Sequence, residues 1–145
     1  MVTKHPRKHP RPGVDEHGRT SLHYAASEGS AQKCADLLAG GANPNASDDG
    51  GWTPLHFAAQ AHSAEVASLL LNAGAVIDAR DRFGNTPLWR ATMNSRGEGV
   101  VIELLRRAGA DPYAQNESGI SPVGLARSIS NFQIAQFYSD LPVGT

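Results

Sequence analysis

His23 and His56 are the side chains whose type and spacing come nearest to metal chemistry. They lie 33 residues apart in two copies of the same short pattern, so a repeating fold would bring the two rings together. Imidazole nitrogen is a common zinc ligand, but a zinc site needs further ligands at characteristic spacings. No cysteine or acidic residue completes such a set around either histidine. We therefore expect each ring to bond to the backbone in the first turn of a helix, and we predict no metal site.

The other reactive side chains do not form a catalytic motif either. Cys34 lies in the apolar phase of an expected helix, and no histidine is placed to activate its thiol. Asp48 and Asp49 are adjacent, so their carboxylates do not converge as a general acid and base would, and we interpret them as a solvated loop tip. A glycine-rich phosphate loop, a His-Glu-x-x-His motif and a nucleophile elbow are all missing. We predict no catalytic residues, no cofactor and no enzymatic activity.

A periodic pattern organises the whole chain. Four copies of one short pattern carry glycines that are separated by 33, 33 and 35 residues, namely Gly18, Gly51, Gly84 and Gly119. Self-similarity at this period indicates a solenoid, in which each unit buries its apolar face only by stacking on its neighbours. Solenoids commonly serve as extended binding surfaces, so the pattern favours a binding protein.

Each unit is expected to contain two helices and a projecting finger. In the second unit, Thr53 and Pro54 match the N-cap and the first position of a helix that ends near Ala61. A second helix is expected from about residue 63 to residue 72. The apolar residues expected on its buried side are Val66, Leu69, Leu70 and Ala73. The turn-rich residues 77–84 are expected to project as a β-hairpin-like finger.

The period predicts a repeat domain over residues 14–145, preceded by an arm. The units span about 14–46, 47–79, 80–114 and 115–141, and the third has two extra residues near 94–99, between its helices. Residues 1–13 hold three prolines, four basic residues and no acid, which predicts a disordered basic arm. Such an arm is either an electrostatic tether to nucleic acid or an acidic partner, or a solvated tail without a role.

Composition limits the classes of protein that the chain can represent. Its 145 residues carry a net charge of −1, and no apolar stretch approaches the roughly 20 residues that span a bilayer. The basic start lacks the apolar segment of a secretory signal, and a single cysteine fits a reducing compartment. We expect a cytoplasmic protein that is monomeric alone. We expect it to bind no membrane and no small-molecule substrate, and to touch nucleic acid at most weakly, through the arm.

The second unit resembles the ankyrin repeat. The resemblance rests on Thr53-Pro54-Leu55-His56-Phe57-Ala58-Ala59, Leu69-Leu70-Leu71 and Gly74-Ala75, which match a Thr-Pro-Leu-His-x-Ala signature with a 33-residue period. It covers about residues 14–141 and implies an all-α solenoid of stacked helix-turn-helix units with β-hairpin-like fingers. The signature histidine and the alanine that follows the signature, Ala59 in the second unit, are replaced by Trp89 and Thr92 in the third unit, and by Gly124 and Arg127 in the fourth. An atypical fourth unit is what a terminal cap of a repeat array requires.

The resemblance implies that a protein partner meets the concave face, formed by the finger tips and the exposed side of each first helix. The residues expected to bind it are Arg19, Asp49, Trp52, Gln60, Arg80, Arg82, Phe83, Asn85, Arg90 and Met93. Trp52 and Phe83 are the expected anchors, because exposed aromatic side chains carry much of the energy of binding. The alternative is that both only cover neighbouring fingers. The charges predict a polarised face, with Arg80, Arg82 and Arg90 on one side and Glu16, Asp48 and Asp49 on the other.

Two non-catalytic functions are compatible with this arrangement. In the first, the chain is a stoichiometric inhibitor, because nearly all of its length is spent on repeats. Its C-terminal residues are similar to those of compact bacterial ankyrin proteins, some of which look like immunity proteins that neutralise a toxin. In the second, the chain is an adaptor or scaffold subunit whose basic arm docks to an acidic surface. Fold alone does not decide between them.

Overall fold

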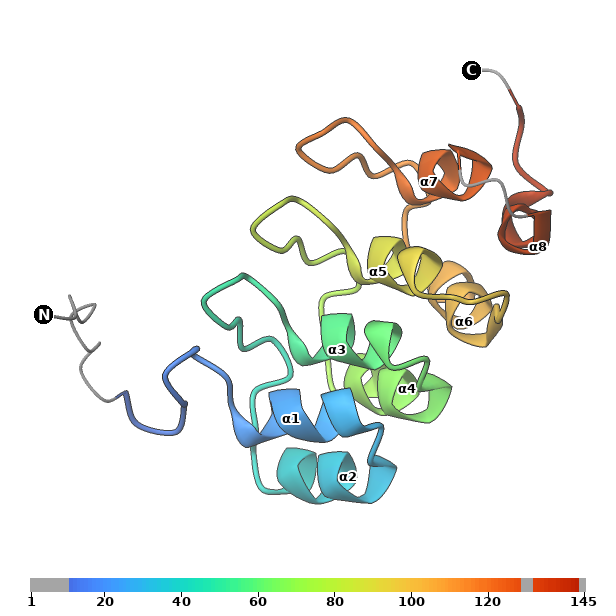
Figure 1. Cartoon of the computed structure of the whole chain (residues 1–145). Coiled ribbons are helices and arrows are strands. Elements are labelled where there is room, and N and C mark those ends of the chain that lie inside the picture. The colour runs from blue at the N-terminus through green and yellow to red at the C-terminus, as the bar shows by residue number, and fades with distance from the viewer. Residues whose placement is uncertain (1–10, 129–131, 144–145) are drawn as a thin grey trace, which may run out of the picture.

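The computed structural model describes residues 11–128 and 132–143, and this part of the chain forms four successive helix pairs without a β-strand. The pairs are α1 (Ser21–Glu28) with α2 (Ala31–Ala39), α3 (Pro54–Gln60) with α4 (Ala64–Asn72), α5 (Pro87–Met93) with α6 (Val100–Arg107), and α7 (Pro122–Ser128) with α8 (Phe132–Ala135). A 3-10 turn, η1 (Gln136–Tyr138), follows α8. Figure 1 shows the first helices stacked in one layer and the second helices in another, with the fingers on one side. The solenoid predicted from the period, and its all-α character implied by the resemblance, are confirmed.

A capping side chain starts each helix of the second unit. The hydroxyl of Thr53 accepts the backbone N–H of His56, and Pro54 occupies the first turn, where no intrahelical donor is needed. Ser63 caps α4 in the same way, by accepting the N–H of Val66. The predicted bounds of both helices agree with the structure to within one residue.

The core runs between the two helix layers. Leu22, Leu55 and Leu88 occupy the same position of successive first helices, and all three are buried. One predicted core residue is wrong: Ala73 is exposed, because it caps α4 beyond the last helical turn. At the next residue, Gly74, the backbone takes a φ of +96°, which turns the chain toward the next finger.

The fingers are tight turns rather than β-hairpins. In the second finger, the backbone N–H of Asp48 donates to the carbonyl of Trp52 at 2.8 Å. The carboxylate of Asp48 accepts the N–H groups of Gly50 and Trp52 at 2.9 and 2.8 Å. Asp48 is consequently buried, and its interpretation as part of a solvated tip is wrong, because the turn needs its carboxylate as an acceptor.

Neighbouring fingers are joined into one row. The N–H of Arg82 donates to the carbonyl of Gly50 at 2.8 Å, and the N–H of Glu117 donates to the carbonyl of Phe83 at 2.9 Å. Gly51 has a φ of +78°, and a Cβ there would lie 2.8 Å from the backbone nitrogen of Arg82. The row therefore requires glycine at the repeated position, and it presents the tip side chains on a hydrogen-bonded backbone.

The long linker of the third unit meets the end of the chain. The linker lies between α5 and α6, at residues 94–99, where the two extra residues are predicted. Phe137 packs so closely on Gly99 that a Cβ would overlap its ring. Tyr138 is fully buried, and its hydroxyl lies 2.6 Å from Oγ1 of Thr92. Thr92, which stands where the second unit has Ala59, thus makes a hydrogen bond to the terminal segment.

Most of the predicted arm, residues 1–10, lies outside the described residues. At its described end, Arg11 forms a bidentate pair with the carboxylate of Asp49, at 3.0 and 3.2 Å. The contact ties the end of the arm to the tip of the second finger.

Candidate protein-binding surface

We call the fingers together with the exposed sides of α1, α3, α5 and α7 the inner surface; it is the concave face that the resemblance predicts (Figure 1). A ladder of stacked side chains crosses its first three units. The guanidinium of Arg19 lies 5.4 Å from the ring centre of Phe57, and that ring lies 4.9 Å from the ring of Trp52. The guanidinium of Arg90 lies 4.3 Å above the Trp52 ring. Trp52 is therefore half-buried within the ladder. Rather than standing free as an anchor, it covers its neighbours.

Buried carboxylates neutralise both arginines of the ladder. Arg90 contacts the carboxylate of Asp81 at 2.6 Å, and that carboxylate is fully buried. Arg19 contacts Asp48 at 3.3 Å, and the carboxylate of Asp48 is almost as inaccessible. An ion pair whose acid is buried holds its arginine in place, because separating the two charges would leave an unpaired carboxylate in the protein. The ladder is therefore a rigid floor rather than a source of free charge.

Asn85 is wrongly predicted as a contact for a partner. Its side chain is only 4% exposed. The amide oxygen accepts the side-chain amide N–H of Asn116 at 2.8 Å, and the carbonyl oxygen of Asn85 lies 2.8 Å from Nε2 of His56. Asn85 thus joins three successive units, and a partner cannot reach it.

Six of the ten predicted contacts are exposed, and two of these are large and apolar. Phe83, at the third finger tip, is 59% exposed, and Met93, at the end of α5, is 52% exposed. Arg82 and Gln60 are exposed as well. These side chains come from neighbouring units and share the inner surface. Phe83 and Met93 bury only about half of their side chains in the fold, so most of their apolar surface is accessible to a partner.

The other two exposed contacts, Arg80 and Asp49, already form bonds within the protein. Arg80 donates to the carbonyls of Gly84 and Gln115, at 3.3 and 2.5 Å. Asp49 is held by Arg11. The predicted polarity of the surface is therefore reduced, because Arg90, Asp48 and Asp49 are each compensated within the protein.

Two further exposed apolar side chains lie on the inner surface, besides the ten contacts expected from the sequence. Tyr24 on α1 is 42% exposed, and Ile120 on the fourth finger is 39% exposed. The hydroxyl of Tyr24 donates to the carboxylate of Asp15, and this hydrogen bond lowers the pKa of Asp15 to about 2. The repeat register assigns both to this face from the sequence, because Tyr24 aligns with Phe57 and Ile120 aligns with Trp52.

His23, His56 and Cys34, the side chains closest to metal or nucleophile chemistry, have structural roles. His23 and His56 each lie with Nε2 at 2.8 Å from a carbonyl oxygen of the next unit, and burial lowers the pKa of both rings. Cys34 is fully buried, and burial raises the pKa of its thiol. Among the described residues, no three His, Cys, Asp or Glu side chains are grouped so that they could hold a metal ion.

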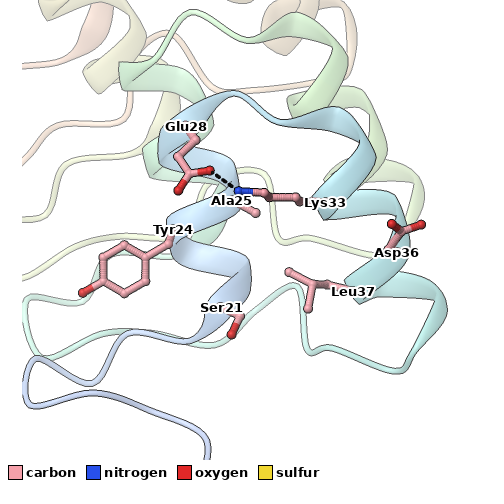
Figure 2. Close-up of a pocket in the computed structure, with 7 residues that line it drawn as sticks. All are labelled: Ser21, Tyr24, Ala25, Glu28, Lys33, Asp36 and Leu37. Carbon is pink, nitrogen blue, oxygen red and sulfur yellow. Dashed lines mark hydrogen bonds and ion pairs between the residues drawn. The ribbon is translucent and has the colours of Figure 1, made fainter.

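An open hollow of about 430 Å³ lies at the first unit, on the side of α1 and α2 that faces away from α3 and α4 (Figure 2). Its floor is apolar, but Lys33 crosses it to reach the carboxylate of Glu28 at 3.0 Å. In the second unit the positions of Lys33 and Asp36 are occupied by Val66 and Leu69, which belong to the hydrophobic core or pack against it. Lys33 and Asp36, polar where the second unit is apolar, suit a solvent-exposed end of the stack. They do not converge on a binding site in the hollow.

Comparison with known proteins agrees with this architecture. A family model described as ankyrin repeats, in three copies, matches residues 22–116. No curated protein matches the chain. No helix in the described part of the chain has the length and apolar character needed to cross a membrane. Because the matched residues cover more than half of the sequence and coincide with the first three helix pairs and the start of the fourth finger, the chain belongs to the ankyrin repeat family.

Proposed function

We propose that this protein is a non-catalytic binding module that acts as a stoichiometric inhibitor, such as an immunity protein that neutralises a toxin or enzyme, through its inner surface. Ankyrin repeats are protein–protein interaction modules, which supports the general part of the proposal. The observation that carries it is the exposure of Phe83 and Met93, at 59% and 52%, on adjacent elements of one surface. Exposed apolar side chains beside a rigid, hydrogen-bonded row suit a pre-organised interface.

The ladder beneath these side chains supports tight binding of one partner. Arg19, Phe57, Trp52 and Arg90 are held by ring contacts and buried carboxylates before any partner arrives. Ordering side chains on binding costs about 0.5–1.5 kcal/mol for each long one, so a surface that is already ordered loses less affinity. A dedicated inhibitor benefits from such a surface more than an adaptor that accepts several partners.

The test is a capture experiment with tagged protein in extracts of its native cells, analysed by mass spectrometry. The variant Phe83→Ala/Met93→Ala removes both exposed apolar side chains, and Val100→Ala is the matched control, because Val100 is 64% exposed but lies on a second helix. We expect one stoichiometric partner, lost with the double variant and retained with the control. A partner retained by both variants contradicts binding at the inner surface. Several partners, lost only when residues 1–13 are removed, favour an arm-dependent adaptor instead.

A further inference from the structure

The arginines of the inner surface divide into compensated and uncompensated ones. Arg19 and Arg90 face buried carboxylates, and Arg11 faces Asp49. By contrast, Arg80 and Arg82 have no ion pair with any carboxylate in the part of the chain that the structure describes. Arg80 donates to two carbonyls, which fix its position, and its charge partly offsets the rise that burial causes in the pKa of Asp78. Both arginines belong to the finger that precedes α5, and Arg82 is therefore the uncompensated arginine of this finger.

Both arginines lie on the same finger as Phe83, which stands at its tip. The backbone there is held from three directions. The N–H of Arg82 bonds to the second finger, the carbonyl of Phe83 accepts from the fourth, and the carboxylate of Asp81 accepts the N–H of Phe83 at 2.9 Å. An exposed aromatic ring and two positive charges are thus displayed on one short, fixed segment.

The outer fingers carry charge of the opposite sign. The carboxylate of Glu16 on the first finger is 85% exposed and has only a 3.5 Å contact with His17, and Glu117 on the fourth finger is exposed. The row of tips is therefore negative at both ends and positive at the third finger. A ligand with a local negative group fits this pattern, whereas a ligand with evenly repeated negative charge meets repulsion on both sides.

We propose that the third finger, Arg80–Asn85, binds an acidic segment of the partner protein that also carries an apolar side chain. The guanidinium of Arg82, with Arg80 beside it, binds a carboxylate, and the ring of Phe83 packs on the apolar side chain. Arginine suits this task, because its planar fork donates two parallel hydrogen bonds to one carboxylate. The inference rests on the proposed function and specifies the chemistry of the partner at the same surface.

The charge balance favours an acidic protein segment over nucleic acid. The affinity of a protein for nucleic acid grows with the number of phosphates that its Lys and Arg side chains neutralise. Beyond residue 13 the chain has nine Lys and Arg (13 in all less four in the arm) against 14 acids, so this part of the protein is net negative. Arg80 and Arg82, between exposed glutamates, do not supply a phosphate-binding track.

The experiment measures fluorescence anisotropy of four labelled probes with the full chain. The probes are a 12-residue Gly/Ser peptide with a central Asp-Glu pair beside Leu and Phe, the same peptide with Ser in place of Leu and Phe, its counterpart with Lys in place of the two acids, and a single-stranded oligothymidine. We expect saturable binding of the first peptide, weakened about tenfold by replacing its apolar residues and weakened by added salt. Arg82→Gln is expected to lower affinity about tenfold, and Arg82→Lys less, because the charge remains but the bidentate fork is lost.

Arg107→Gln is the matched control, because Arg107 is an exposed arginine on the second helix α6, with only a 3.9 Å contact to Glu103. The affinity of the Arg107→Gln variant for the first peptide is expected to equal that of the wild type. Absence of binding, binding unaffected by Arg82→Gln, or equal binding of the Lys peptide or of oligothymidine would each overturn the inference. Failure of the two proposals is distinguishable. If the native partner is lost with Phe83→Ala/Met93→Ala but retained with Arg82→Gln, only the acidic specificity is wrong.

Discussion

Nε2 of His56 lies 2.8 Å from the carbonyl oxygen of Asn85, which belongs to the next unit. The other ring nitrogen, Nδ1, is 3.1 Å from the backbone nitrogen of Thr53, so one ring ties the start of α3 to the third finger. His23 forms the same bridge to the carbonyl of Trp52. At the third unit Trp89 replaces this histidine, and its indole N–H is buried without a hydrogen-bond partner among the described residues. The first two junctions between units therefore have a bridge that the third junction lacks.

Replacing His56 is expected to weaken the whole stack. His56→Ala removes the bridge, leaves the carbonyl of Asn85 with only the backbone N–H of Asp81 as a donor, and opens a cavity, so we expect a loss of about 2–4 kcal/mol in the free energy of unfolding. Urea denaturation followed by circular dichroism measures the loss. His17→Ala, at an exposed finger position, is the control and should change stability by less than about 0.5 kcal/mol. Equal stability of the two variants would show that the bridge contributes nothing.

Stability is expected to rise with pH between about 5.5 and 7.5. Burial lowers the pKa of His23 and His56 below 6.5, so the unfolded chain takes up these two protons at a higher pH than the folded chain does. As pH falls below about 6.5, the unfolded state is favoured progressively. Urea denaturation at pH 7.5 and pH 5.5 tests this, and the difference should shrink in His56→Ala. A wild-type protein that is more stable at pH 5.5 than at pH 7.5 would contradict this prediction. Asp15, whose pKa is about 2, contributes only in more acidic solution.

Thr92 and Tyr138 are expected to be energetically coupled. Their hydroxyl groups lie 2.6 Å apart in the core, and burial raises the pKa of Tyr138 to about 12. Thr92→Val leaves the tyrosine hydroxyl without this partner and should reduce stability by about 1–3 kcal/mol, whereas Tyr138→Phe should cost about 1 kcal/mol. The double variant should lose less than the sum of the two single losses, as a double-mutant cycle measures. Strict additivity would indicate that the hydrogen bond does not form.

Trp52 and Phe83 are expected to behave differently, although the sequence pattern treats them as equivalent anchors. Trp52 stacks between Phe57 and Arg90, so Trp52→Ala should reduce the free energy of unfolding by about 1–3 kcal/mol. Phe83 is 59% exposed, so Phe83→Ala should change it by less than about 0.5 kcal/mol. Thermal melting of both variants tests the contrast. Equal melting temperatures would mean that the ladder is not part of the stable fold.

Leu70→Ala tests the assignment of the core. Leu70 is fully buried on α4, where the sequence predicts it. Removing three carbons from this position should cost about 2–5 kcal/mol, because a cavity remains between the helix layers. Leu71→Ala, on the same helix but only partly buried, is the matched control and should cost clearly less. A similar loss in both variants would place the core elsewhere.

The sequence by itself determined the fold and most of its local features. The period, the capping threonines and the repeated glycines are local signals, because each depends on backbone geometry within a few residues, and they predict the helix pairs and the finger turns correctly. The long linker of the third unit was also predictable, because two extra residues interrupt an otherwise constant period.

Only the tertiary structure decided which inner-surface residues a partner can reach. Asn85 and Trp52 occupy finger positions that the period marks as exposed, but the first is buried by contacts to His56 and Asn116, and the second is half-buried between Phe57 and Arg90. The tertiary structure also decided which charges are compensated. Arg90 and Arg82 are equivalent candidates in the sequence, but only Arg90 faces a buried carboxylate. Such contacts depend on side-chain positions and on how neighbouring units stack. A repeat pattern specifies the backbone of each unit but not these pairings between units.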